Sequence, residues 1–369
     1  MTKVFKLKFP CSSVLARALA MLLIGLFAGL LGACGGGGGG GGASTGSGSG
    51  SAGIPANTPT GTNSNAPVTS TISAATVTPT YTGEELSAYN TVSLARSACG
   101  FGGVNQNATL DAAALNHNAY LAQNYQFGHF ETLGLVGYTG NQPYQRGVAS
   151  GYSSAFTHYT EVLSMATNTP KTGFGALGAR RLLAAPYHLV GIMGVDREVG
   201  ISVRNAGQVG SGADYIVANS SWAPSVYLAI NFAAQQSMPM QHQSSTDVLT
   251  YPCAGIAGTA YQLSAETPNP IPSRNLATAP IGQPIFVQVL AGQTLVITSA
   301  SVIGPSGAVA LLPTMTNAND PNSELTTSQA MIIPAAPLLQ NSSYSVSIVG
   351  TNGGVAFTRN FTFTTGAFS

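Results

Sequence analysis

The first half of the chain repeats apolar residues with the period of a helix. One stripe follows Gly83 and comprises Leu86, Tyr89, Val92 and Ala95. A second stripe follows Asn107 and comprises Leu110, Ala113, Ala114, His117 and Leu121. Spacings of three and four residues are typical of amphipathic helices, so each stripe predicts a helix. Because His117 lies on an apolar face, we interpret it as a buried histidine with satisfied hydrogen bonds.

Shorter patterns complete this half. The stretch "QPYQRGVASGY" predicts a short helix, and "LGARRLLAAPYHLVGIM" predicts another that Pro186 interrupts. After them, "EVGISVR" and "ADYIVANSSW" read as strands. Helices around a small antiparallel sheet make an α+β domain, which we place at residues 83–236.

The second half alternates apolar and polar residues instead. From about residue 280 the stretches "PIFVQVL", "TLVITSASV", "AVALLP", "QAMIIP", "SYSVSIVG" and "VAFTRNFTFTTG" follow one another between turn signals. Short alternating strands with turns between them predict an all-β, Ig-like sandwich over residues 280–369. The turn-rich stretch between the halves, residues 237–279, predicts a Pro-rich connector. The sandwich carries almost no His, Asp or Glu, which indicates a spacer or binding module.

The N-terminus has the pattern of an export signal. Residues 1–34 carry three lysines near their start, Lys3, Lys6 and Lys8, and continue with an apolar run that ends in "LLGAC". This ending resembles a bacterial lipobox, in which Cys34 is acylated and anchors the mature chain in a membrane. A plain signal peptide or an anchor helix is the alternative. Since Gly35 rather than Asp follows, the resemblance to Gram-negative lipoproteins favours the outer membrane, on its periplasmic side or at the cell surface.

A low-complexity segment follows the lipobox. Residues 35–82 are rich in Gly, Ser, Thr and Pro, a composition that cannot build a core and predicts a disordered tether. For roughly 48 residues, a flexible chain has an r.m.s. reach of roughly 40 Å. The folded part is therefore expected near the membrane but not against it.

Composition narrows the function classes. Charged residues make up 7 % of the chain, against about 25 % in typical soluble proteins, which fits an exported protein better than a cytosolic enzyme. The formal net charge is +1, and no basic patch is present, so we expect no nucleic-acid partner. Beyond the lipobox only Cys99 and Cys253 remain, and in an oxidising compartment such a pair predicts a disulfide rather than two buried thiols.

Five segments follow one another in the order "AYNTVSLARSACGFGGVNQNATLDAAALNHNAYLAQN", "GHFE", "YTGNQPYQRGVASGY", "YTEVLSM" and "APYHLVGIMGVDREVGISV". In this order they resemble the bacterial branch of the CAP superfamily (cysteine-rich secretory proteins, antigen 5, pathogenesis-related 1). The resemblance covers roughly residues 84–235. It implies an α-β-α sandwich with a cleft between two histidines and two glutamates, which holds a divalent metal in some members.

The resemblance assigns cleft residues position by position. His129 takes the place of the first histidine, Glu161 that of a glutamate and His188 that of the second histidine. The residues that flank Glu161 are not the Gly and Asn of the family, and the second glutamate has no clear counterpart. Further candidates are Glu131, which we read as a loop residue, Glu198 at a strand start, and His158, which would share a face with Glu161 if that segment were helical.

Three functions remain open. The first is a non-enzymatic binding module, which we expect to be a monomer, with a lipid, sterol or protein ligand and a His/Glu cleft. Two imidazoles and a carboxylate are suitable ligands for Zn²⁺, so Zn²⁺ or Mg²⁺ is the candidate cofactor. The second is a metal-dependent hydrolase of peptides or esters that uses the same cleft, with no assigned catalytic residue beyond it. The third is a structural envelope protein. A Ser/His/Asp triad has no support because no Gly-x-Ser-x-Gly elbow is present.

Overall fold

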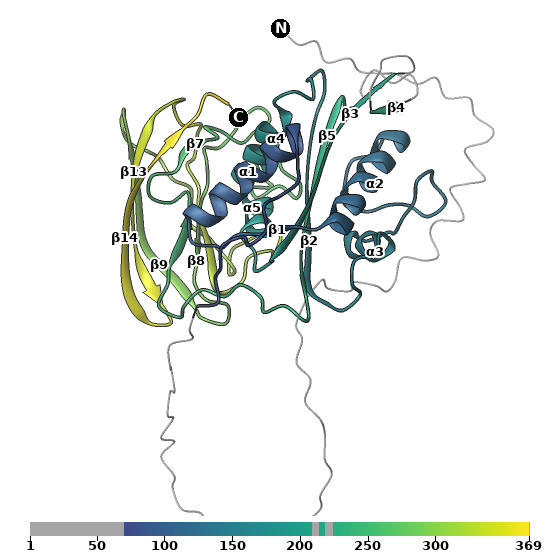
Figure 1. The fold of residues 1–369 in the computed structure, drawn as a ribbon. Helices are drawn as coiled ribbons and strands as arrows, with labels where there is room; N and C mark the ends of the chain where they lie inside the picture. Colours follow the sequence, from purple (N-terminus) through teal and green to yellow (C-terminus); the bar gives the residue numbers. More distant parts are fainter. Residues whose placement is uncertain (1–69, 209–213, 218–223, 369) are drawn as a thin grey trace, which may run out of the picture. The chain divides into compact units, whose positions relative to one another are not determined.

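A computed structural model describes residues 70–208, 214–217 and 224–368 (Figure 1). The predicted export signal, Cys34 and most of the predicted tether lie outside the described residues. Among the helices within those ranges, none has the length and apolar character needed to cross a membrane.

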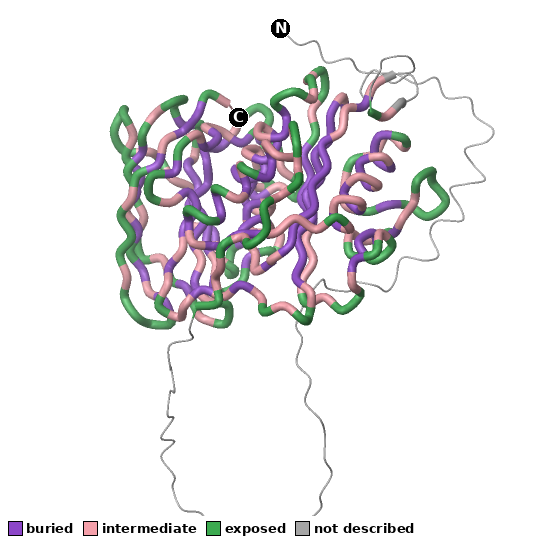
Figure 2. Tube along the Cα trace, viewed as in Figure 1, coloured by how far each residue is buried: buried purple, intermediate pink, exposed green. Residues whose placement is uncertain are grey.

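The first sheet joins strands from the middle of the chain. Its order is β1 (Asn105–Gln106), β3 (Glu198–Gln208), β5 (Val226–Gln235) and β2 (Phe156–Ala166), and β4 (Tyr215–Val217) also pairs with β3. The three long strands are antiparallel to their neighbours, and β1 and β4 run parallel to β3. Nine of the ten residues of β5 are buried. Figure 2 shows these buried positions as a continuous band through the sheet.

Five helices accompany this sheet in the described residues, namely α1 (Gly83–Ala98), α2 (Ala108–Asn124), α3 (Pro143–Ala149), α4 (Phe174–Ala184) and α5 (Pro186–Ile192). In Figure 1, α2 and α3 lie on one face of the first sheet, and α1, α4 and α5 lie on the other. The second helix begins where its sequence predicts, because the Asn107 side chain accepts hydrogen bonds from the backbone N–H groups of Thr109 and Leu110. The predicted interruption at Pro186 separates α4 from α5.

Two further sheets come from the second half of the chain. One has the order β10 (Gly307–Ala308), β9 (Leu295–Gly304), β13 (Ser343–Asn352), β14 (Val355–Thr365) and β7 (Ala257–Thr259). The other has the order β11 (Met315–Thr316), β12 (Gln329–Ile332), β8 (Ile285–Gln288) and β6 (Leu249–Tyr251). The alternating stretches near residues 285, 295, 329, 343 and 355 therefore form strands, as predicted. Two short strands, β6 and β7, lie in the region predicted to be a connector.

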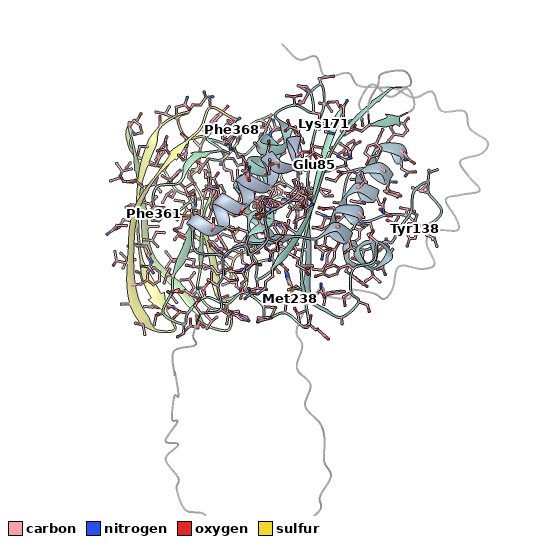
Figure 3. All side chains as sticks on the ribbon, viewed as in Figure 1. Glu85, Tyr138, Lys171, Met238, Phe361 and Phe368 are labelled. Carbon is pink, nitrogen blue, oxygen red and sulfur yellow. A yellow bond between two sulfur atoms is a disulfide. The ribbon has the colours of Figure 1, made fainter. Side chains whose placement is uncertain are left out.

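The two halves share one hydrophobic core. Buried residues of α1, α4 and α5 belong to the same cluster as Phe286, Met331 and other residues of the third sheet. The rings of Phe101 and Phe286 stack with centroids 6.1 Å apart. Figure 3 labels Phe368 near the C-terminus, whose ring lies 4.5 Å from the Arg180 guanidinium on α4. The helices α1, α4 and α5 thus lie between sheets and do not form an outer layer.

The predicted fold class, an α-β-α sandwich followed by a separate Ig-like sandwich, is therefore wrong. The described residues form fourteen strands in three mostly antiparallel sheets and only five helices, which is a β-rich fold. The prediction of this fold class failed because some helices pack on more than one side. In α4, for example, the adjacent residues Leu182 and Leu183 are both buried. Adjacent residues point in directions about 100° apart on a helix, so α4 contacts neighbours on two sides. A single apolar stripe in the sequence does not reveal the second neighbour.

A disulfide joins the two halves. Cys99, at the end of α1, is bonded to Cys253, which follows β6, and the two Cα atoms are 5.4 Å apart. The predicted pairing is thereby confirmed. The bridge closes a loop of 154 residues, for which loss of chain entropy in the unfolded state is worth up to about 5 kcal/mol.

Candidate functional site

The three residues assigned to the cleft come together from distant parts of the sequence. His129 follows α2, Glu161 lies on β2 and His188 lies on α5. The Nδ1 atom of His129 is 3.1 Å from Glu161 Oε1. The ring centroids of His129 and His188 are 6.2 Å apart. The structure therefore places both imidazoles side by side, but only His129 contacts Glu161.

Both imidazoles line a surface cavity of about 480 Å³. Its apolar wall comprises Phe127, Leu163, Met165, Leu182, Ala185 and Leu263. Its polar lining comprises His129, Ser164, Arg181, His188, Gln262, Ser264, Glu266 and Thr267. A cavity with a mainly apolar wall and a few convergent polar groups is the usual form of a small-molecule site.

Glu266 completes the polar part of the cavity, and sequence reasoning missed it. Its side chain is fully buried, and Oε1 accepts hydrogen bonds from the backbone N–H groups of Tyr187 and His188 at 2.8 and 3.3 Å. The same oxygen is 3.2 Å from His188 Nδ1. The second oxygen, Oε2, has no hydrogen-bond partner among the described residues. Glu266 lies in the predicted connector, where no local pattern identifies it.

The two histidines are oriented in the same way. Each places Nδ1 against a buried carboxylate, Glu161 for His129 and Glu266 for His188. A carboxylate only accepts hydrogen bonds, so each Nδ1 is the donor when the carboxylate is ionised. Neither Nε2 has a hydrogen-bond partner in the described part of the chain. Each imidazole therefore has one nitrogen fixed by the protein and one that remains for a ligand.

Glu161 accepts hydrogen bonds from a buried arginine in addition to its contact with His129. Its two oxygens accept hydrogen bonds from Nη2 of the buried Arg146 on α3 at 2.7 and 2.8 Å. The same guanidinium donates through Nη1 to the carbonyl oxygens of His129, Gly140 and Asn141. Arg146 thus connects the carboxylate below the cavity to the loop that carries His129.

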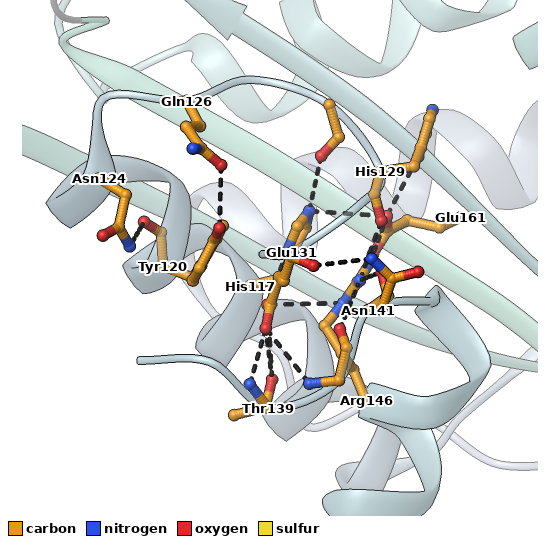
Figure 4. Close-up of polar contacts among 12 residues, drawn as sticks. His117, Tyr120, Asn124, Gln126, His129, Glu131, Thr139, Asn141, Arg146 and Glu161 are labelled. Carbon is orange, nitrogen blue, oxygen red and sulfur yellow. Dashed lines mark hydrogen bonds and ion pairs between the residues drawn. The ribbon is translucent and has the colours of Figure 1, made fainter. Parts of the chain in front are cut away.

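Glu131 is a buried partner in this network and not a simple loop residue. It is fully buried, with Oε1 2.9 Å from His117 Nδ1 and 3.7 Å from Arg146 Nε. Its Oε2 accepts hydrogen bonds from the backbone N–H groups of Thr139 and Gly140 at 2.7 and 3.3 Å (Figure 4). Glu131, the last residue of "GHFE", therefore stabilises the loop from inside.

His117 balances the charges of this cluster. Both of its ring nitrogens face acceptors, Glu131 Oε1 for Nδ1 and the carbonyl oxygen of Gly128 for Nε2, each at 2.9 Å. A carbonyl oxygen and an ionised carboxylate only accept hydrogen bonds, so both ring nitrogens of His117 are donors when Glu131 is ionised. His117 and Arg146 then offset the charges of Glu131 and Glu161. The prediction of a buried, hydrogen-bonded His117 is confirmed.

Electrostatics differ between the two carboxylates beside the cavity. Burial alone would raise the pKa of Glu161, but the charges of His117 and Arg146 and the hydrogen bond from His129 lower it to about 2. Burial raises the pKa of Glu266, against the opposing hydrogen bond and charge of His188. Glu161 therefore stays ionised under all ordinary conditions, whereas Glu266 takes up a proton more readily than a solvated glutamate.

The two remaining candidates lie elsewhere. The segment of His158 forms β2 and not a helix, so His158 and Glu161, three residues apart, point to opposite faces. His158 Nδ1 lies 2.7 Å from the buried carboxylate of Asp196. Glu198 accepts hydrogen bonds from Asn107 and Tyr152 at 2.7 and 2.6 Å. Neither residue lines the cavity of His129 and His188.

The residues present fit a metal ion poorly. Across residues 70–208, 214–217 and 224–368, no three His, Cys, Asp or Glu side chains are grouped so as to hold one ion. Glu161, assigned as the third ligand, has both oxygens bonded to Arg146. Catalytic zinc sites ordinarily use three protein ligands and one water, and among the described residues the two imidazoles and Glu266 do not form such a group.

Comparisons with known proteins identify no family and a distant structural similarity. No known family matches the sequence, and no curated protein matches it. Among solved structures, an outer surface protein from Borrelia burgdorferi is similar over 42 % of this chain and 93 % of that chain, with 14 % sequence identity and a TM-score of 0.30. A similarity this low supports no conclusion about fold or function.

Proposed function

We propose that this chain is an exported, lipid-anchored binding protein that holds a small amphipathic ligand in the cavity of His129, His188 and Glu266. The observation that carries the proposal is the arrangement of the two imidazoles. Each has Nδ1 fixed by a buried carboxylate and Nε2 without a partner among the described residues, and both line one cavity. Fixed polar groups of this kind orient a ligand at low entropic cost.

The lining of the cavity favours a lipid or sterol among the ligands considered. Leu163, Met165, Leu182 and Leu263 offer an apolar surface to a hydrocarbon body. The unpartnered Nε2 atoms and Glu266 Oε2 offer hydrogen bonds to a polar head group. The lipobox at Cys34, if acylated, keeps such a cavity near the membrane that supplies the ligand.

The kinship with the CAP superfamily remains part of this proposal. It rests on the order of the five sequence segments. The contact of His129 with Glu161 and the closeness of His129 to His188 support the residue assignments taken from it. The kinship adds a reason to expect binding, since that family is mostly regarded as non-enzymatic.

The other two functions have weaker support. A metal-dependent hydrolase needs a third ligand, and Arg146 already occupies the carboxylate of Glu161. A purely structural role explains the buried cluster but not the two imidazole nitrogens and the Glu266 oxygen that lack partners beside a cavity.

Titration with a fluorescent fatty acid and a fluorescent sterol, without vesicles, tests the binding function. We expect saturable binding of at least one probe, and a loss of tenfold or more in Met165→Trp, which places a bulky ring at the cavity. Ile303→Trp on β9 is the matched control, since Ile303 is also an exposed apolar strand residue distant from the cavity lining. If both probes bind more weakly than about 1 mM, or if the two variants lose affinity equally, the proposal is wrong.

A further inference from the structure

The loop between α2 and α3 exposes an unusual number of apolar side chains. Its exposed members are Phe127 at 43 %, Phe130 at 59 %, Leu133 at 79 %, Leu135 at 37 % and Val136 at 67 %. Figure 2 shows the loop as an exposed segment beside α2, and Figure 3 labels Tyr138 on it. Single exposed apolar residues are common on soluble proteins, but five within ten positions form a patch that calls for a binding partner.

The exposed tip of this loop carries no charged or titratable acid, base or histidine. Residues 132–140 contain no Asp, Glu, Lys, Arg or His. The nearest charged residue in the sequence, Glu131, is fully buried and bonded to His117 and to loop N–H groups. Arg146, which reaches the same loop through backbone carbonyls, is also buried. The charges that stabilise the loop therefore point inward, and its outer surface is left apolar.

The loop is closed and fixed at its base. The backbone N–H of Glu131 donates to the carbonyl of Asn141 at 3.1 Å, and the Asn141 side chain donates to the carbonyl of Glu131 at 2.8 Å. Asn124 on α2 donates to the carbonyl of Val136 at 2.8 Å, which ties the tip to the helix. Gly134 and Gly137 adopt left-handed φ values of 90° and 77°, which permits the two turns of the tip. An apolar surface presented on a fixed loop loses little conformational entropy when it binds.

We propose that the tip of this loop, residues 132–137, inserts into the headgroup interface of a lipid bilayer. A small, projecting, uncharged tip suits a membrane better than a protein partner, because a stable protein interface buries at least ~1,000 Å². Phe130 at the base of the tip adds an exposed apolar side chain of a kind that membrane-surface segments bury at the boundary between headgroups and hydrocarbon.

The sequence that precedes the described residues also favours a lipid bilayer as the partner of this loop. The predicted lipid site, Cys34, is separated by roughly 35 residues from the start of the described chain at residue 70. The disordered tether that its composition predicts would have an r.m.s. reach of roughly 30–35 Å over that length. The anchor therefore keeps the loop at a high local concentration of bilayer, so that a weak insertion is sufficient. The inserted loop also brings Phe127 and His129, which line the cavity, to the membrane surface.

Vesicle sedimentation tests this insertion separately from the cavity ligand. The chain from residue 34 onward, with Cys34→Ala to remove the acylation site, is mixed with vesicles of phosphatidylethanolamine and phosphatidylglycerol. We expect measurable partitioning that falls tenfold or more in Leu133→Ser/Val136→Ser. The matched control is Ile303→Ser/Val355→Ser, which removes two exposed apolar residues from β9 and β14 and should leave partitioning unchanged.

A second readout reports on insertion directly. Leu133→Trp adds a second indole to a chain that has one Trp, at position 222. When vesicles are added, the emission of this variant should shift to shorter wavelength by more than that of the parent chain. Equal partitioning of the loop variant and the parent chain overturns the proposal. So does a dimer of the parent chain in solution that Leu133→Ser/Val136→Ser dissociates, because the loop then contacts a second copy. Fatty acid binding in Leu133→Ser/Val136→Ser is expected to persist, since the cavity itself is unchanged.

Discussion

Two histidine–glutamate pairs lie beside the same cavity, and the pKa values of their glutamates are shifted in opposite directions. In each pair a histidine Nδ1 contacts a fully buried carboxylate, at 3.1 Å for His129 and Glu161 and at 3.2 Å for His188 and Glu266. Yet the pKa of Glu161 is lowered to about 2, whereas the pKa of Glu266 is raised. Residue types and contact distances alone would suggest the same charge state for both.

The difference comes from what lies behind each carboxylate. Burial opposes ionisation of both, but Glu161 also faces the charges of His117 and Arg146. Glu266 has only His188 and two backbone N–H groups on the same oxygen. The pKa of a buried carboxylate is therefore lowered where several cations lie next to it, and a single neighbouring histidine does not offset the effect of burial on Glu266.

The largest expected effect is the removal of the guanidinium that distinguishes the two pairs. Arg146→Met leaves Glu161 buried without its main hydrogen-bond donor and removes the nearest guanidinium to Glu131. Breaking a buried pair in this way costs about 3–5 kcal/mol of unfolding free energy. Urea unfolding at neutral pH measures the loss. The matched control is Lys171→Met, because Lys171 forms a solvent-exposed ion pair with Asp214, which is worth about 0–1 kcal/mol. Equal losses in the two variants would show that Arg146 has no special electrostatic role.

The second largest effect is expected in the way the unfolding free energy changes as the pH is lowered. The pKa of Glu161 falls from 4.5 to about 2 on folding, which corresponds to about 3 kcal/mol. Because the folded pKa is the lower one, this stability is present above the unfolded value and disappears as the pH falls toward the folded value. Unfolding free energies from neutral pH to about pH 2 should therefore decline over this window. In Glu161→Gln the decline should be smaller by that amount, and an unchanged profile would contradict the assignment.

The smallest change in unfolding free energy is expected for the pair of His188 and Glu266. Glu266→Gln replaces a carboxylate whose pKa is raised by burial with a neutral group of the same shape. A raised pKa means that the wild type loses stability as the pH rises through the folded pKa, and the variant does not. At neutral pH the variant should be as stable as the wild type or more stable by up to about 1 kcal/mol. A loss larger than that would indicate that the ionised form of Glu266 stabilises the fold.

Sequence reasoning was most accurate where local pattern determines structure. The stripes of Leu86 to Ala95 and Leu110 to Leu121 form α1 and α2, and the alternating stretches near residues 295, 343 and 355 form long strands. The central strand β5 was missed. Its residues are almost all buried, so they show no alternation, and a continuous apolar run does not distinguish a strand from a helix.

The site was predictable only in part for a related reason. The contact of His129 with Glu161 follows from the order of the family-like segments, and neither residue type nor spacing would have given it. Glu266 carries no local signal, because its role depends on how a connector packs against α5. Glu131 was read as a loop residue because polar loops ordinarily face water, whereas here the loop folds around it. Tertiary contacts of this kind are not encoded in any short window of sequence.

The disulfide between Cys99 and Cys253 has a consequence for the chain after proteolysis. The exposed loop between α2 and α3 lies within the 154-residue interval that the bridge closes. A cut there divides the polypeptide into two fragments, but the bridge keeps them covalently joined. The shared core of helices and sheets can then keep its packing around the break. A nicked molecule should migrate as one species on a non-reducing gel and as two fragments only after reduction.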